Sequence, residues 1–264
     1  MNKYFKACFY IMSSLLVMIF INNSLVIAQE KNEPLSGDRI YDYMQEHNIS
    51  AQKAYNEVAK LEQQLSSASI NNKPEILFEL AKYKTFLGIV HTETNYVKKH
   101  LDEYTYFEPA NDYVYKGNDL QEIINKYPDS SLADDAAYMY STRGPLTECE
   151  GDVKCYMNLD LYKYKDFLLK FDKSPYTKNV LKDINSDFAL LYEDNPNYYI
   201  GDDTTVFFKL LDEYNSILMT MTNPLRVTGL QTLYRAYKKL NQNEKSLKVL
   251  DVINKNFPGY KLEK

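Results

Sequence analysis

The sequence contains no tryptophan and only eight glycines in 264 residues, and runs of β-branched residues are few. A β-sandwich or barrel is built on such runs, so this composition favours long helices. The chain also lacks a glycine-rich phosphate loop, a G-x-S-x-G nucleophile turn and an H-E-x-x-H zinc pattern. These absences argue against an enzyme and predict an all-α protein with no catalytic residues.

Histidine is also scarce, with only His47, His91 and His100. His91 and His100 are nine positions apart, which on one helix separates them by about 13 Å along the axis, too far to share a metal ion. His100 and Glu103 would supply two ligands, but the sequence shows no third. We therefore expect neither a metal site nor a cofactor.

Acidic residues gather in two segments, 148–152 and 194–203. Their carboxylates would suit calcium, but neither segment has the ligand spacing of an EF-hand loop. We expect both to be solvated loops.

Residues 1–28 have the pattern of a secretory signal peptide. Lys3 and Lys6 precede an apolar stretch, and Ala28 offers a small residue before a cut at Gln29. The alternative is a retained membrane anchor, but polar residues at 22–24 interrupt the apolar run before the roughly 20 residues that span a bilayer. The prediction is a mature chain that is periplasmic or secreted, and no cysteine stands directly after the cut to carry a lipid anchor.

Positive charge is in deficit. Residues 1–28 hold two lysines and no acidic residue, so the balance of 31 basic to 36 acidic residues becomes 29 to 36, a net charge of −7 for the mature chain. Nucleic acids and anionic lipids attract clustered positive charge. We therefore expect no nucleic-acid binding and no strong membrane binding after cleavage.

Two cysteines remain in the mature chain, Cys149 and Cys155, within the segment CEGDVKC. In an oxidising compartment they most simply form a disulfide. A redox pair and a metal site are the alternatives, but the spacing is neither C-x-x-C nor a zinc pattern. A disulfide across so short a loop should stabilise the fold by about 2 kcal/mol.

The segment 29–108 carries two heptad-like apolar patterns, over 40–65 and 76–104, joined by a polar break that ends at Pro74. These patterns predict two long helices. The helices either close on each other as a hairpin or join an oligomeric coiled coil. Because the two helices are held close in one chain, intramolecular closure should win. We expect a mainly monomeric protein, with oligomers possible through 40–104.

Residues 109–264 contain a recurring pattern in which an apolar pair leads to an aromatic residue and a turn. The aromatic residues are separated by 44, 43 and 43 positions, at Tyr127, Phe171, Tyr214 and Phe257. A fixed period of this length is typical of stacked helical hairpins. Ser174-Pro175 and Asn223-Pro224 suit the cap and first turn of a following helix. The pattern therefore predicts helical repeats, with each aromatic residue ending a helix at a joint between repeats.

The last predicted unit resembles the tetratricopeptide repeat. Leu230, Leu233 and Tyr237 would line its first helix, and Leu247, Leu250 and Ile253 its second. Tyr237, Ser246, Leu250 and Pro258 match the aromatic, small, large and closing proline positions of that family. The chain departs from it at Tyr234 and Ile253, where the family has small residues. The resemblance implies a degenerate α-solenoid over 109–264, following the N-terminal hairpin.

The string YPDSSLADDAAYMYS, at 127–141, resembles the joints of bacterial envelope tetratricopeptide proteins. These include the periplasmic coiled-coil partner of the Tol-Pal system and, more distantly, the repeat lipoprotein of the outer-membrane β-barrel assembly machine. The order of signal, heptad helices and repeats is closer to the first. This resemblance implies that the partner is an envelope protein or peptide.

Tyrosine is abundant in the repeat half and suits binding surfaces. The alternative is that the tyrosines are core residues, since several fall at core-like spacings. We expect the first helices to turn Tyr138, Gln231 and Arg235 toward a partner. The sequence as a whole predicts an exported, non-enzymatic scaffold for protein–protein interactions. The alternative is an enzyme or metal-binding module built on a helical array.

Overall fold

The computed structural model describes residues 35–144, 148–193, 195–201 and 204–262. The chain divides into two units, Met1–Leu35 and Ser36–Lys264, and all elements below belong to the second. The predicted signal peptide, residues 1–28, lies outside the described residues. In the ranges that are described, no helix is both long and apolar enough to cross a membrane.

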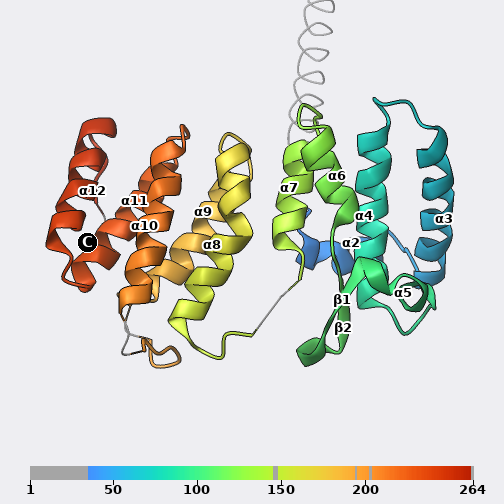
Figure 1. Cartoon of the computed structure of the whole chain (residues 1–264), viewed down its shortest axis with the longest axis horizontal. Helices are drawn as coiled ribbons and strands as arrows, with labels where there is room; N and C mark the ends of the chain where they lie inside the picture. Colours follow the sequence, from blue (N-terminus) through green and yellow to red (C-terminus); the bar gives the residue numbers. More distant parts are fainter. Residues whose placement is uncertain (1–34, 145–147, 194, 202–203, 263–264) are drawn as a thin grey trace, which may run out of the picture. The chain divides into compact units, whose positions relative to one another are not determined.

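The described chain is mostly helical, as predicted (Figure 1). Its first part contains a short 3-10 helix, five α-helices, two strands with two further 3-10 turns, and a sixth α-helix after Tyr127. These elements are η1 (Gly37–Arg39), α2 (Ile40–Glu46), α3 (Ala51–Ser67), α4 (Lys73–Ile89), α5 (Tyr96–Lys99), η2 (Leu101–Glu103), β1 (Tyr104–Phe107), η3 (Glu108–Ala110), β2 (Asp112–Tyr115), α6 (Asn118–Lys126) and α7 (Ala133–Thr142).

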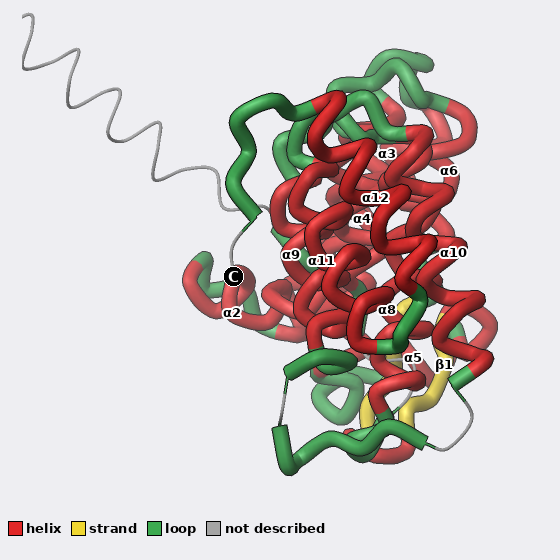
Figure 2. The backbone as a smooth tube through the Cα atoms, turned by 90° about the vertical axis from the view of Figure 1, so that its left-hand side faces the viewer, coloured by secondary structure: helices red, strands yellow, loops and turns green. Residues whose placement is uncertain are grey.

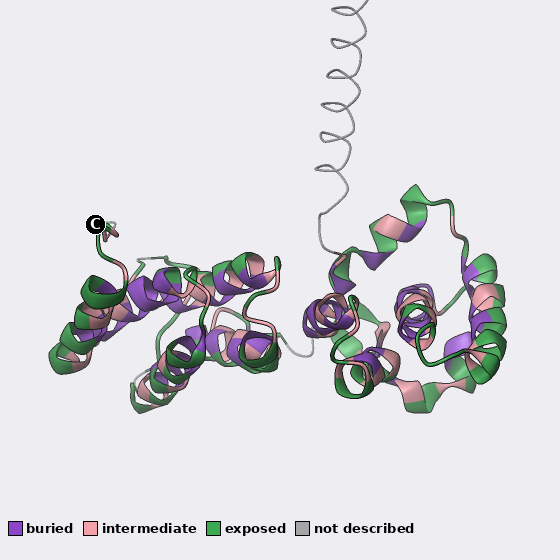
Figure 3. Ribbon diagram, turned by 90° about the horizontal axis from the view of Figure 1, so that it is seen from above, coloured by how far each residue is buried: buried purple, intermediate pink, exposed green. Residues whose placement is uncertain are grey.

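Longer helices make up the rest of the described chain. They are α8 (Val153–Lys170), α9 (Thr177–Ala189), α10 (Thr205–Thr220), α11 (Arg226–Lys239) and α12 (Asn243–Asn256). Consecutive helices pack as neighbours at α8 and α9, α10 and α11, and α11 and α12, while α8 also contacts α10 and α9 contacts α11. One continuous apolar core runs from α7 to α12. Figure 3 shows the buried sides of these helices turned toward their neighbours.

Helix α4 is the central helix of the first part, because it packs against α2, α3, α6 and β2. It is therefore buried on nearly all sides, including at Lys82 and Lys84. Helix α3 is buried on one stripe only, at the predicted positions Ala51, Ala54, Val58 and Leu61. Side chains of the opposite face of α3 are exposed and polar, as in an amphipathic surface helix.

The helix predicted from Ile40 is interrupted. Residues 47–50 separate α2 from α3, with Asn48 in the left-handed region at φ 53°. Ser50 then caps α3, because its hydroxyl accepts a hydrogen bond from the N–H of Lys53 at 3.2 Å. A side chain that competes for backbone hydrogen bonds in this way starts a new helix rather than continuing the old one.

The second predicted helix ends at Ile89 instead of continuing to Tyr104. Thr92, Thr94 and Asn95 follow it, and residues of this kind favour caps and turns over helix interiors. The chain beyond them forms an antiparallel pair of strands, β1 and β2, with Tyr104 opposite Tyr115 (yellow in Figure 2). The predicted boundary between residues 108 and 109 falls in η3, between these two paired strands.

Gly88 explains how the strand pair reaches α4. A Cβ atom at this position would lie 2.2 Å from the carbonyl oxygen of Tyr113 and 3.1 Å from the ring of Tyr104. Only glycine therefore permits this approach, which strands β1 and β2 use to cover the end of α4.

Three of the four predicted joints lie where the spacing places them. Tyr127, Phe171 and Phe257 directly follow α6, α8 and α12, and each donates its N–H to the carbonyl four residues earlier. The fourth prediction, Tyr214, is wrong. It lies inside α10, which continues to Thr220 because Ile217 and Leu218 still pack into the core.

The last helical pair also differs from the pattern predicted for it in one respect. Leu230, Leu233 and Tyr237 of α11 are buried, as is Ile253 of α12. Leu247 is 62% exposed, however, so the buried stripe of α12 passes through Val249 instead.

Candidate functional site

Three of the joints between helices, those before α7, α9 and α11, share one local geometry. In each, a side-chain oxygen accepts a hydrogen bond from the N–H two residues later, and the carbonyl of the same residue accepts one from the N–H three residues later. The residues that do this are Ser130, Ser174 and Asn223, with side-chain distances of 3.3, 3.3 and 2.9 Å and carbonyl distances of 3.0, 3.1 and 3.1 Å. Such turns are typical of serine and asparagine. The helices begin three residues later, with Tyr176 and Leu225 at the N-cap positions of α9 and α11. The predicted caps at Ser174 and Asn223 are therefore wrong, because these residues form the turn before the cap.

Successive joints also contact one another. Ser174 donates its hydroxyl proton to a carboxylate oxygen of Asp134 at 2.9 Å, which joins the second joint to the start of α7. Asp172 accepts hydrogen bonds from the hydroxyl of Thr222 at 3.0 Å and from the N–H of Asn223 at 3.1 Å. Burial opposes the charge of Asp172, but these hydrogen bonds hold its pKa below the ordinary value. The guanidinium of Arg226 lies 5.6 Å from the ring of Phe257 in the last joint.

A groove opens between η1, α7, α8 and α10. Its volume is about 650 Å³. The guanidinium of Arg143 stacks 3.6 Å over the ring of Tyr140 and donates a hydrogen bond to the carbonyl of Lys116 at 2.7 Å. Tyr162 on the groove wall is 77% exposed. A second hollow of about 250 Å³ shares the Tyr140 side chain with the first. We call these two hollows the Tyr140 groove.

Charges in the Tyr140 groove are partly paired. Lys165 forms an ion pair with Glu213 at 2.6 Å, and Lys163 lies 3.7 Å from Asp160. The groove therefore combines paired charges with an aromatic ring and a stacked guanidinium, and tyrosine and arginine are enriched where proteins bind other polypeptides.

The three residues expected to face a partner do not meet. Tyr138 and Gln231 are each only 6% exposed. The ring of Tyr138 packs 4.8 Å from that of Tyr176, and Gln231 accepts a hydrogen bond from the hydroxyl of Tyr260. Arg235 is half-buried, with its guanidinium 5.8 Å from the ring of Tyr192. The structure thus places Tyr138 and Gln231 in the core. For Tyr138 this agrees with the alternative interpretation, in which the tyrosines are core residues.

Tyr140 and Tyr162 are the groove residues that sequence reasoning missed. A signal for Tyr162 was present, because the apolar stripe of α8 passes through Met157, Leu161 and Tyr164. Tyr162 falls off that stripe, and a large aromatic residue on the solvent side of an amphipathic helix is a candidate contact residue.

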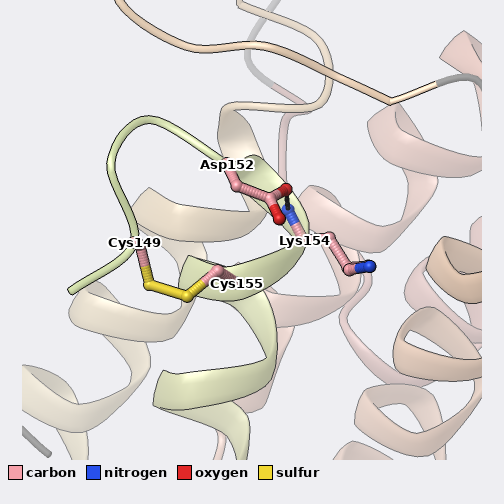
Figure 4. Close-up of a disulfide and its surroundings, with 4 residues drawn as sticks. All are labelled: Cys149, Asp152, Lys154 and Cys155. Carbon is pink, nitrogen blue, oxygen red and sulfur yellow. Dashed lines mark hydrogen bonds between the residues drawn. A yellow bond between two sulfur atoms is a disulfide. The ribbon is translucent and has the colours of Figure 1, made fainter. Parts of the chain in front are cut away.

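Cys149 and Cys155 form a disulfide, with Cα atoms 5.4 Å apart (Figure 4). The bond closes the loop that leads into α8. Asp152, inside this loop, caps the helix by accepting a hydrogen bond from the N–H of Lys154 at 3.0 Å. The predicted pairing is confirmed.

Lys84 is the centre of a buried ionic cluster. Its ammonium lies 2.9 Å from Glu103 and 3.2 Å from Asp119, and the hydroxyl of Tyr115 donates to Asp119 at 2.5 Å. Burial alone would lower the pKa of Lys84, but the two carboxylates raise it above the ordinary value. The ammonium is therefore charged, and the cluster joins α4 to η2, β2 and α6.

A second cluster of carboxyl groups lies between α8 and α9. Asp160 and Asp187 share a hydrogen bond, and the hydroxyl of Tyr164 donates to Asp183 at 2.8 Å. Burial, followed by the charge of Asp160, raises the pKa of Asp187 to about 7. Among the residues that the structure describes, no three histidine, cysteine, aspartate or glutamate side chains are placed to hold a metal ion.

Comparison of the sequence with known protein families gives no matching family model. Comparisons with curated proteins and with solved structures likewise give no match.

Proposed function

We propose that the protein is an exported, non-enzymatic helical-repeat scaffold that holds an envelope protein or peptide. The observation that carries this proposal is the series of matched joints, in which Ser130, Ser174 and Asn223 make equivalent turns. Repeated units that bond to their neighbours through equivalent turns build an extended surface, and such surfaces bind other polypeptides.

In this proposal the helices from α7 onward form a degenerate tetratricopeptide-like solenoid. Helices α7, α9 and α11 are the first helices of the units, and α8, α10 and α12 are the second. The contacts of α9 with α11 and of α8 with α10 support that assignment. The units differ in length, because Ser174 follows Ser130 by 44 residues and Asn223 follows Ser174 by 49.

The preceding part is a helical hairpin that caps the solenoid. Helices α3 and α4 pack against each other, and the remaining sides of α4 are covered by α2, α6 and β2. Because α4 has no free apolar seam of the kind a coiled coil needs, this packing supports a mainly monomeric protein.

The partner binds at the Tyr140 groove. A volume of about 650 Å³ accommodates several side chains of a bound peptide, and the exposed ring of Tyr162 offers a large amphipathic contact. Export rests on the pattern in residues 1–28, and the disulfide supports it, since disulfides persist in oxidising compartments.

Affinity capture combined with metal analysis tests this function. The mature chain, residues 29–264, is immobilised and exposed to an extract of the envelope, and its metal content is measured beforehand. We expect a distinct envelope protein to be retained, and retention to fall at least tenfold in the Tyr162→Ala variant.

The control for that capture is Tyr106→Ala, since Tyr106 is 49% exposed on β1 and lines neither hollow of the groove. It should retain the protein as the unmodified chain does. Stoichiometric metal together with no retained protein would support the metal-binding or enzymatic alternative instead.

A further inference from the structure

Two loops meet beside the disulfide. The first is the loop before α8, residues 148–152, and the second is 195–201. Tyr199 donates its N–H to the carbonyl of Gly151 at 3.0 Å, and its own carbonyl accepts from the N–H of Val153 at 3.3 Å. These bonds make a parallel bridge between Asp152 and Tyr199. The two loops therefore form one unit.

The contact between these loops is rigidly built. The disulfide closes the first loop, which Figure 4 shows curving from Cys149 to Cys155. Gly151 has a φ of 87°, and a Cβ atom there would lie 2.7 Å from the carbonyl oxygen of Asn197. A side chain at position 151 would thus push the loops apart.

This rigid unit holds apolar side chains in solvent. Tyr198 packs edge-on against Tyr156 with ring centroids 5.5 Å apart, while its neighbours Tyr199 and Ile200 are 57% and 41% exposed. Adjacent exposed apolar residues on a preorganised loop are suited to binding, because little conformational freedom is lost when a partner covers them.

The surroundings of Tyr199 and Ile200 are acidic. Glu148, Glu150 and Glu193 are exposed, and none of them takes part in the ion pairs of the described residues. Across 148–155 and 190–201 the sequence has one basic residue, Lys154. Uncompensated carboxylates beside an apolar pair complement a ligand that carries both positive charge and apolar surface.

We propose that the surface formed by Glu148, Glu150, Tyr199 and Ile200, the Tyr199 surface, docks a basic segment of a partner polypeptide. Lysine or arginine side chains of that segment face the carboxylates, and an apolar side chain beside them covers Tyr199 and Ile200. This inference rests on the proposed scaffold function and adds a second contact, with a stated chemistry, beyond the Tyr140 groove.

Peptide selection on the intact chain tests it. A library of displayed random peptides of about 12 residues is panned against residues 29–264 with the disulfide formed. We expect enriched peptides to be rich in lysine and arginine and to carry an aromatic or aliphatic residue. The affinity of a synthetic representative should fall at least tenfold in the Tyr199→Ala/Ile200→Ala variant, and likewise in Glu148→Gln/Glu150→Gln.

Matched controls keep the test specific. Leu247→Ala removes an exposed apolar side chain on α12, and Glu75→Gln/Glu93→Gln removes the same amount of charge from exposed positions elsewhere. Both should leave the peptide affinity within twofold of that of the unmodified chain. Circular dichroism and thiol labelling verify that each variant is folded and that its disulfide is formed.

Four outcomes would overturn the Tyr199 surface. Unchanged affinity in Tyr199→Ala/Ile200→Ala, with loss in Tyr162→Ala, would leave the scaffold function standing and assign peptide binding to the groove alone. Selected peptides without net positive charge would refute the proposed partner chemistry. Stoichiometric calcium binding in calorimetry, lost in Glu148→Gln/Glu150→Gln, would assign the loops to a cation instead. Failure of the unmodified chain to retain either a peptide or an envelope protein would overturn both proposals.

Discussion

Replacing Asp187 by asparagine removes one partner of the carboxyl pair that joins α8 to α9. In the folded protein Asp187 shares a hydrogen bond with Asp160, and burial raises its pKa from 3.8 to about 7. A carboxyl group whose folded pKa is raised binds its proton more tightly in the folded state. Its contribution to stability is therefore fully present below the unfolded pKa of about 4 and is lost as the pH rises to about 7.

The size of this effect follows from the shift of the pKa. A pKa that rises by about 3 would correspond to about 4 kcal/mol, because each tenfold change in proton affinity is worth about 1.36 kcal/mol. Asp187 is only half-buried, and Lys163 and solvent screen the pair, so we discount the effect to about 1–2 kcal/mol. Asparagine resembles the protonated carboxyl group, so the variant should lack this loss.

Urea unfolding at pH 5 and pH 8 measures this pH-dependent loss of stability. Groups common to both proteins cancel when the variant is compared with the unmodified chain. We expect the unmodified chain to lose about 1–2 kcal/mol more than Asp187→Asn between the two pH values. The exposed Asp251→Asn on α12 serves as a control and should follow the unmodified chain. Parallel pH profiles for the unmodified chain and Asp187→Asn would refute the reasoning.

Three further predictions concern the backbone, the disulfide and assembly. Gly88→Ala should lower the free energy of unfolding by about 2–3 kcal/mol, because the added Cβ would clash with β2. Gly201→Ala, with open space around it, should change that free energy by less than about 0.5 kcal/mol. Equal urea midpoints for the two variants would contradict this prediction. Replacing Cys149 and Cys155 by serine should cost about 2 kcal/mol, and thiol labelling of the denatured unmodified chain should find no free cysteine. Light scattering on residues 29–264 at micromolar concentration should give the mass of one chain, and two or three times that mass would show an oligomer.

The sequence predicts the features here that depend on local pattern. The stripe of α3, the turns at Ser130 and Ser174 and the disulfide all follow from residues close together in the chain. A side-chain oxygen that bonds its own backbone, or two cysteines six positions apart, needs no distant partner to take its conformation.

Features set by distant contacts escape such reasoning. Tyr214 looks like a helix end because Asn215 and Ser216 follow it, yet α10 continues because its next turn packs into the core. The strand pair of β1 and β2 depends on close approach to Gly88, about 20 residues earlier in the chain. Heptad spacing alone cannot distinguish these residues from a continuing helix.

Two of the residues predicted to face a partner, Tyr138 and Gln231, are buried for the same reason. Gln231 is polar and off the apolar stripe of α11, but Tyr260, beyond the end of α12, covers it and donates a hydrogen bond to it. Tyr138 is covered by Tyr176 of the following joint. In stacked helices the exposure of a residue depends on the neighbouring unit, and the sequence of one helix does not contain that information.

Site-specific photo-crosslinking tests the central claim, that the chain is a scaffold for an envelope partner, most directly. A photoreactive residue is placed at position 162, on the wall of the Tyr140 groove, or at position 247, an exposed control site on α12, and the cells that make the protein are irradiated. The account predicts one discrete adduct with an envelope protein from position 162 and none from position 247. Absence of any adduct from position 162, in a protein that is exported and folded, would contradict it.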